Sequence, residues 1–335
     1  QLTLSNGDNV IEVTGLLSTY YDQRFLKPGE EDHKKDRFKL RDAQIQLEGR
    51  YRNIFEYELQ FDIADMSANG GTIDPENPGL MDAYVTWKAI PHFDVTFGYG
   101  KVPYGRSTNV PSRYSPYWQR PEMMRGDLLH VRAIGVTLGS GFCKQRARVQ
   151  AGVYTGLGEA SLSGDNDASG RPEYIGRVEM AWPSRYRKRD IDDRITPVPM
   201  IVVGANARYM DKSQPLDGSL PPSVGGSYDL KVIDGKRTVV GCDVSAQYQG
   251  FSAQFEIHRL RLDPAKPNSA LFEGLPAELN DGYVLAGGYY GQLNWFSRQW
   301  KTILSARFEE LNLSDLSPGD MQRVSAAVAY QVRGW

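Results

Sequence analysis

One segment of the chain concentrates residues that could bind an anion. The segment 102–127, VPYGRSTNVPSRYSPYWQRPEMMRGD, carries two carboxylates, Glu122 and Asp127, and four arginines: Arg106, Arg113, Arg120 and Arg125. Arginine stays charged at neutral pH, and its planar donor fork matches the oxygens of phosphates and carboxylates. Because rings of arginine or lysine select anions in pores, these residues predict an anion filter at a constriction.

The same arginines have an alternative, structural use. Alternating segments that precede this loop carry carboxylates on their polar side, which form a predicted acidic wall: Glu56, Glu58, Asp62, Asp82 and Asp94. A basic loop that lies against an acidic wall would pair with it, and pairing would anchor the loop and cancel its field. Both interpretations stay open, and the same residues can serve both.

Later segments carry the opposite charge on their polar side. They form a predicted basic wall with anion-interacting arginines: Arg146, Arg148, Arg177 and Arg208. The two walls predict a lumen that is electrically polarised. Neutralising Arg146 and Arg148 together should then shift ion selectivity towards cations.

Long β-strands are the elements expected to position these residues. In FEYELQFDI, Phe55 to Ile63, large apolar residues alternate with charged or amide residues, and period two is typical of a strand because successive side chains point to opposite faces. The same alternation predicts fourteen strands, at 10–21, 37–50, 52–64, 80–90, 92–101, 128–140, 143–155, 173–183, 198–210, 236–249, 251–262, 283–296, 300–311 and 321–333.

Strand length and loop length together indicate a membrane barrel. Soluble strands average roughly 5–6 residues and membrane-spanning strands need about 9–11, so the predicted strands have membrane-spanning length. Short turns alternate with long polar loops, as in bacterial outer-membrane proteins, and no apolar run predicts a transmembrane helix. We expect an all-β transmembrane antiparallel β-barrel, one domain over 1–335, with 102–127 folded into its lumen as a constriction loop.

One connection breaks the pattern of short turns. The segment 184–197, SRYRKRDIDDRITP, falls where the topology predicts a short periplasmic turn, and it contains a run of basic residues: Arg185, Arg187, Lys188 and Arg189. A solvated turn and a docking point for a periplasmic partner both fit this run.

Other classes of function find little support in the sequence. The net charge of −2 gives no reason to expect a nucleic-acid partner. The four histidines are scattered, and neither a nucleophile arrangement nor a Gly-rich phosphate loop accompanies them. We therefore expect no enzymatic activity, no cofactor and no metal site. Cys143 and Cys242 are expected to be separate thiols, because no disulfide framework surrounds them.

Several short motifs resemble those of the phosphate-selective porin O and P family, an outer-membrane β-barrel porin family. The motif residues are Phe38, Arg41, Ala43 and Gly49 in the first hairpin, Asp82–Tyr84, then Gly98, Lys101 and Pro103, and Arg132–Val136. The resemblance covers about residues 36–140. It implies a porin of sixteen strands whose third long loop folds into the lumen, so we expect a last hairpin to be missing after Trp335.

The combined prediction is a passive porin in a bacterial outer membrane. It would pass small hydrophilic, anionic, phosphate-like solutes, and it would form a homotrimer or part of a larger outer-membrane complex. The alternative is a non-conducting structural barrel subunit of a larger outer-membrane protein complex. The extended segment 184–197 and the crowded, aromatic segment 102–127 favour this alternative.

Overall fold

The computed structural model describes most of the chain. The described residues are 2–22, 37–64, 79–111, 114–117, 119–124, 131–155, 170–183, 189–212, 235–265, 283–312 and 321–330. The helical elements with defined bounds are short: helix α2 (Arg106–Asn109) and 3-10 helix η2 (Glu122–Met124). Within the described ranges, no helix has the length and apolarity needed to cross a membrane.

Strands dominate the described part of the chain, and fifteen of them follow one another in an antiparallel sheet in sequence order. The strands are β1 (Leu2–Asn6), β2 (Asn9–Asp22), β3 (Arg37–Tyr51), β4 (Phe55–Asp62), β5 (Leu80–Trp87), β6 (Phe93–Lys101), β7 (Arg132–Phe142), β8 (Ala147–Tyr154), β9 (Glu173–Trp182), β10 (Met200–Lys212), β11 (Gly235–Tyr248), β12 (Phe251–Pro264), β13 (Val284–Ser297), β14 (Thr302–Asn312) and β15 (Met321–Tyr330). The all-β prediction is confirmed.

Two details of the predicted strands need correction. Strand β1 was not predicted, because five residues are too few to show a clear alternation, yet it pairs with β2 from Leu2↔Val13 to Asn6↔Asn9. The strand predicted at 143–155 begins at Ala147, because residues 143–145 have φ values of 51°, 59° and 66° and form a left-handed turn. Arg146 therefore lies in a turn.

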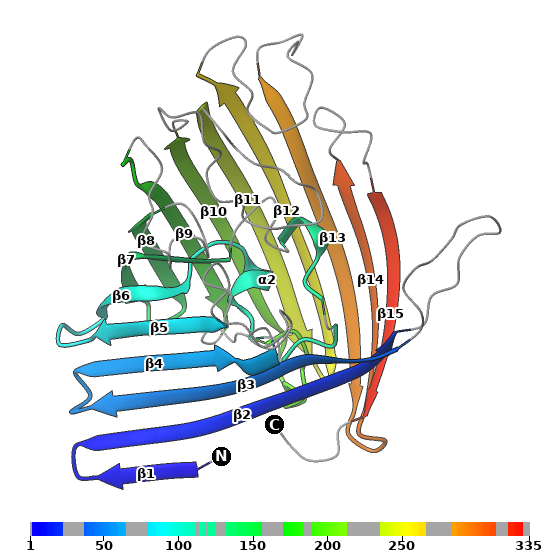
Figure 1. Cartoon of the computed structure of the whole chain (residues 1–335). Coiled ribbons are helices and arrows are strands. Elements are labelled where there is room, and N and C mark those ends of the chain that lie inside the picture. The colour runs from blue at the N-terminus through cyan, green and yellow to red at the C-terminus, as the bar shows by residue number, and fades with distance from the viewer. Residues whose placement is uncertain are drawn as a thin grey trace. The chain divides into compact units, whose positions relative to one another are not determined.

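By its internal contacts the chain divides into two compact units. The first comprises Gln1–Ala89 and Gly98–Gly100, and it contains β1 to β5. Its strands pair in order in Figure 1, with registers such as Glu58↔Tyr84 between β4 and β5. Phe55, Leu59 and Phe61 lie exposed on one face of β4, as the alternation predicts.

The second unit comprises Ile90–Phe97 and Lys101–Trp335. Figure 1 shows β8 to β15 in sequence order across its sheet. On β9, Tyr174, Val178 and Trp182 are exposed while Arg177 and Glu179 are buried. We call the side that carries Arg177 the covered face and the side that carries Val178 the apolar face. The free thiols of Cys143 and Cys242 are both exposed in this unit, as expected.

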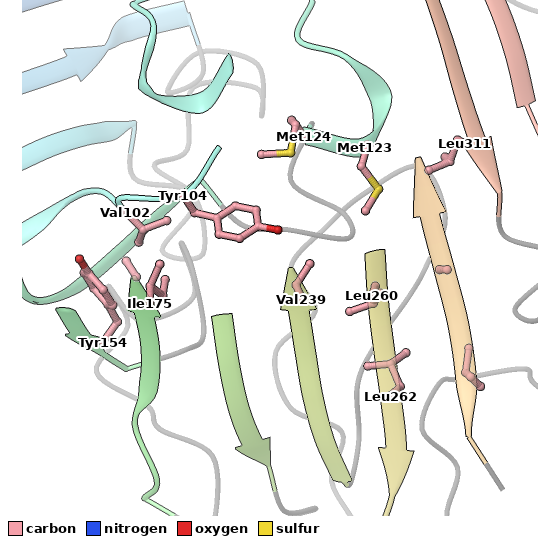
Figure 2. Close-up of a cluster of buried hydrophobic side chains, with 13 residues drawn as sticks. Val102, Tyr104, Met123, Met124, Tyr154, Ile175, Val239, Leu260, Leu262 and Leu311 are labelled. Atoms are coloured by element: carbon pink, nitrogen blue, oxygen red, sulfur yellow. The ribbon is translucent and has the colours of Figure 1, made fainter. Parts of the chain in front are cut away.

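A hydrophobic cluster joins the segment after β6 to the covered face. Val102, Tyr104, Met123 and Met124 pack with buried side chains of β11 and β12 that include Leu260 (Figure 2). Burying a large apolar side chain contributes about 1.5–3 kcal/mol, so several such residues hold the segment firmly. A smaller cluster contains Ile191, Phe296 and Ile303.

Candidate functional site

Glu256 of β12 anchors the start of the segment 102–124. Its carboxylate is fully buried and accepts hydrogen bonds from the backbone N–H groups of Arg106 (2.7 Å) and Ser107 (3.0 Å). The Tyr290 hydroxyl donates to it at 3.0 Å, and Nε2 of His258 lies 2.9 Å away. A buried charge is tolerated when several donors surround it, so these contacts make Glu256 a strong attachment point.

Gly105 makes this attachment possible. Its φ of 69° turns the chain so that the next two N–H groups face Glu256, and a Cβ at this position would lie 2.7 Å from Oε1 of Glu256 and 2.5 Å from Cε of Met124. Only glycine adopts this conformation at low cost and leaves that space empty. The preceding Tyr104 hydroxyl lies 2.8 Å from Nδ1 of His258, which adds a second contact with β12.

The far end of the segment is attached to β14 and β15. Glu309 accepts a hydrogen bond from the backbone N–H of Glu122 at 2.8 Å. Arg323 donates to both carboxylates, at 2.8 Å to Glu122 and 3.4 Å to Glu309. Arg307 donates to the carbonyl oxygen of Gln119 at 3.0 Å and lies over the ring of Tyr117. Charged side chains of the covered face thus hold the segment at both ends.

A second segment, 189–196, lies on the same face. The carbonyl oxygen of Asp190 accepts hydrogen bonds from Ser252 (2.6 Å), Gln254 (3.0 Å) and Asn294 (3.0 Å). The Asp192 carboxylate accepts hydrogen bonds from the backbone N–H of Gly250 at 2.9 Å and that of Thr196 at 2.8 Å. These contacts and the buried Ile191 fix the segment on β11 to β14.

The two segments contact each other. The backbone N–H of Asp190 donates to the carbonyl oxygen of Tyr114 at 3.3 Å, and Arg106 donates to the carbonyl oxygen of Arg189 at 2.8 Å. The guanidinium of Arg189 lies 4.3 Å from the ring centre of Tyr114 and pairs with Asp193 at 2.6 Å. Segment 189–196 is therefore packed inside a set of contacts, whereas Arg185, Arg187 and Lys188 of the predicted turn lie outside the described residues.

Burial shifts the titration of two groups in these segments. It raises the pKa of the Asp190 carboxyl, although the charge of Arg106 opposes the shift. Burial, with the charge of Arg132 adding to it, lowers the pKa of the Arg120 guanidinium to about 10. Arg120 remains protonated at neutral pH, and it donates to the carbonyl oxygens of Ser107 and Val110.

Most of the predicted anion-interacting arginines have partners in the protein. Arg106 is buried, and Arg177 pairs with Glu179 at 2.6 Å and with Asp243 at 2.7 Å. Arg208 pairs with Glu173 at 2.8 Å. Arg106 and Arg120 donate to backbone carbonyl oxygens, whereas the structural alternative placed the loop arginines against the acidic wall. Predicted basic residues outside the described ranges are Arg113, Arg125, Arg185, Arg187 and Lys188.

One residue of the predicted basic wall forms an ion pair with one residue of the predicted acidic wall in the second unit. Arg148 lies 3.1 Å from the carboxylate of Asp94, with its side chain 30% exposed. Arg146 is exposed in the turn before β8 and does not share this pair.

The other residues of the predicted acidic wall lie in the first unit, on one face of β4 and β5. Glu58 accepts hydrogen bonds from Gln46 at 2.8 Å and from the Tyr84 hydroxyl. Glu56 pairs with Lys88. Two further members of this wall are buried: Asp62 and Asp82. These residues share the less exposed face of their strands, and the bonds of Glu56 to Lys88 and of Glu58 to Gln46 and Tyr84 lie within the unit.

Arg237 is a charged residue of the covered face that the sequence reasoning missed. It is 9% exposed, and its Nε and Nη2 atoms have no hydrogen-bond partner among the described residues. Arg208 and Glu173 are charged side chains close enough to act on it. The alternation along β11 does indicate its position. Arg237, Val239 and Asp243 are separated by even numbers of residues, so their side chains all lie on the covered face. The strand predicted at 236–249 contains Arg237, but the residue was not counted among the arginines of the basic wall.

Comparisons with known proteins agree with this architecture. An anion-selective porin from Comamonas acidovorans superimposes with a TM-score of 0.60 at 8% identity, over 97% of this chain and 85% of that chain. OmpF of Salmonella typhi, in a complex with daunomycin, gives a TM-score of 0.42 at 11% identity, over 98% and 99% of the two chains. No curated protein sequence matches. Residues 15–188, more than half of the chain, match the family described as "Phosphate-selective porin O and P". The chain belongs to the phosphate-selective porin O and P family.

Proposed function

We propose that this protein is a passive porin of a bacterial outer membrane and that it favours small, phosphate-like anions. Membership of the family supports the pore and the location. The apolar face of the second unit supports insertion in lipid, since Met180, Trp182 and Leu293 are each about 60% exposed there. In this proposal 1–335 forms one barrel domain, the segment 102–127 narrows its lumen, and copies of the chain associate as trimers.

The observation that carries anion selectivity is Arg237. An isolated buried charge is costly unless an opposite charge or hydrogen-bond acceptors accompany it. The neighbouring Arg208 and Glu173 bond to each other at 2.8 Å, while two donor atoms of Arg237 have no partner among the described residues. A passing phosphate or carboxylate would supply the missing acceptors, and the arginine fork suits such oxygens.

Ion selectivity in a planar bilayer tests this function. Wild-type protein in a salt gradient should give steady conductance steps with a reversal potential of the anion-selective sign. Arg237→Gln should lower the anion-to-cation permeability ratio by about tenfold, since ~1.4 kcal/mol corresponds to a factor of ten. Lys236→Gln is the matched control, because Lys236 is the exposed neighbour on the opposite face. A cation-selective wild type, or equal effects of the two substitutions, would refute the proposal.

A non-conducting structural subunit is the second candidate. The observation that favours it is the fixed packing of 102–124 and 189–196 on one covered face. Folded protein that inserts into the bilayer and gives no conductance steps would select this function over the porin.

A further inference from the structure

The apolar face carries a groove at the end of the sheet where the tight turns lie. It has a volume of ≈510 Å³ and is lined by residues of β10 to β14, some outward-facing, such as Phe251, and some buried, such as Ser252 and Asn294. Ala246 and Ala253 are cross-strand neighbours on its floor, and Leu293 separates them from Ala306. The larger side chains of Phe251 and Trp295 also line it. Volumes of about 300–1,000 Å³ are typical of sites for small ligands, so the groove is large enough to hold part of one.

Aromatic residues border the groove next to the β13–β14 turn. The rings of Phe251 and Trp295 stack with centres 6.2 Å apart, and Trp295 meets Trp300 edge-on at 6.1 Å. Trp300 is itself 62% exposed in the turn. Tryptophan rings favour the boundary between hydrocarbon and headgroups, so the groove begins at the level of the lipid headgroups and extends towards the hydrocarbon.

Two cations flank Trp300 in this turn. Arg298 and Lys301 are both exposed, and neither has a hydrogen-bond or ion-pair partner among the described residues. Cations next to an apolar groove complement a molecule with an anionic head and a hydrocarbon tail. Their charge argues against an uncharged lipid and distinguishes this groove from a plain patch of apolar wall.

We propose that this groove is a binding site for an anionic glycerophospholipid. One acyl chain would lie over Ala246 and Ala253, beside Leu293, and the phosphate would contact Arg298 and Lys301. In outer-membrane barrels the tight turns face the periplasm, so the lipid would come from the inner leaflet. The site rests on the proposed membrane location but is separate from the residue proposed for ion selectivity, because Ala246 and Ala253 lie on the apolar face and Arg237 lies on the covered face.

Native mass spectrometry of the detergent-solubilised full chain tests the site with two probes, phosphatidylglycerol and phosphatidylethanolamine. Wild-type protein should retain phosphatidylglycerol in preference. Ala253→Phe fills the floor, so retention should fall by about tenfold, whereas Ala205→Phe, on the apolar face of β10 outside the groove, should retain lipid like the wild type. The double variant R298Q/K301Q should lose the preference for phosphatidylglycerol, with Lys236→Gln as its charge control.

Several results would overturn the proposal. Equal retention by Ala253→Phe and wild type would show that no acyl chain occupies the groove. An unchanged preference for phosphatidylglycerol in R298Q/K301Q would show that Arg298 and Lys301 do not select an anionic headgroup, which refutes the anionic lipid as ligand. A change from trimer to monomer mass in Ala253→Phe, with lipid retention unchanged, would instead assign the groove to a second copy of the chain. Bilayer conductance of the same variants separates these outcomes from failure of the porin function, since a wild type that conducts but retains no lipid refutes only the site.

Discussion

Glu58 in the first unit bonds to neighbouring strands of its own sheet, whereas Glu256 and Glu309 in the second unit hold other segments of the chain. Glu58 in the first unit bonds to Gln46 and Tyr84, which lie on the strands next to it. Glu256 and Glu309 in the second bond to backbone N–H groups 150 and 187 residues away. The same alternation of polar and apolar residues thus builds a self-contained wall in one unit and an attachment surface in the other.

The strongest way to break this contrast is Glu256→Ala. Removing a carboxylate that has several buried donors should cost about 3–5 kcal/mol, and it should detach the start of the segment 102–124. Limited proteolysis of the detergent-solubilised protein should then cut within that segment. Glu58→Ala is the control in the first unit and should leave this segment protected. Protection of the segment in Glu256→Ala would contradict the role of Glu256.

Gly105→Ala tests the same attachment more finely. It keeps the carboxylate of Glu256 and changes only the backbone that brings the N–H groups of Arg106 and Ser107 to it. The new Cβ would meet Oε1 of Glu256 and Cε of Met124, at a φ of 69°. At φ 69° and ψ 151° the backbone lies in a region that is essentially restricted to glycine, so alanine there costs about 1–3 kcal/mol before any clash. We expect a lower unfolding temperature and faster cleavage in 102–124, both smaller than for Glu256→Ala. At Gly7, also at positive φ but with open space around it, alanine should have the smaller effect.

The pH dependence of stability tests the second attached segment. Since burial raises the pKa of Asp190 in the folded protein, its protonated form is favoured there, and this stabilisation is lost as pH rises through the raised pKa. Asp190→Asn should therefore gain stability relative to the wild type as pH increases from about 4, the ordinary carboxyl pKa, towards neutrality. Thermal unfolding across this range measures it. Asp8→Asn, at an exposed pair with Arg52 in the first unit, serves as the control, and parallel profiles for Asp190→Asn and wild type would refute the effect.

The smallest effect is expected in the first unit. The double variant E56Q/E58Q keeps hydrogen-bond acceptors but removes two charges, one of them at the exposed pair with Lys88. The anion-to-cation permeability ratio should rise by about twofold, because salt screens exposed charges beyond ~10 Å. Reversal potentials in a salt gradient measure the change. A fall in the ratio would exclude an acidic wall that opposes anions.

Local alternation was enough to predict the strands and the facing of Glu58, Arg177 and Arg208, because period two depends only on neighbouring residues. It could not predict the attachment of Arg106 to Glu256, which are far apart in sequence and meet only when β12 is in place. The position of segment 189–196 was missed for the same reason, since its partners lie on strands that follow it. Arg237 lies inside the strand predicted at 236–249, so the alternation that places Asp243 on the covered face was enough to find it.

The distance in sequence between the attached segments and their partners has a consequence for biogenesis. Glu122 lies 201 residues before Arg323, with which it pairs, and Tyr117 bonds to the carbonyl oxygen of Ser325, 208 residues away. Contacts between residues so far apart in sequence form late, because closing a long loop costs conformational entropy before the stabilising contacts can form. While strands are still being added, the arginines and carboxylates that will be buried remain hydrated. The interior of this protein is therefore completed last, and an assembly intermediate without β14 and β15 would leave the end of the 102–124 segment unattached.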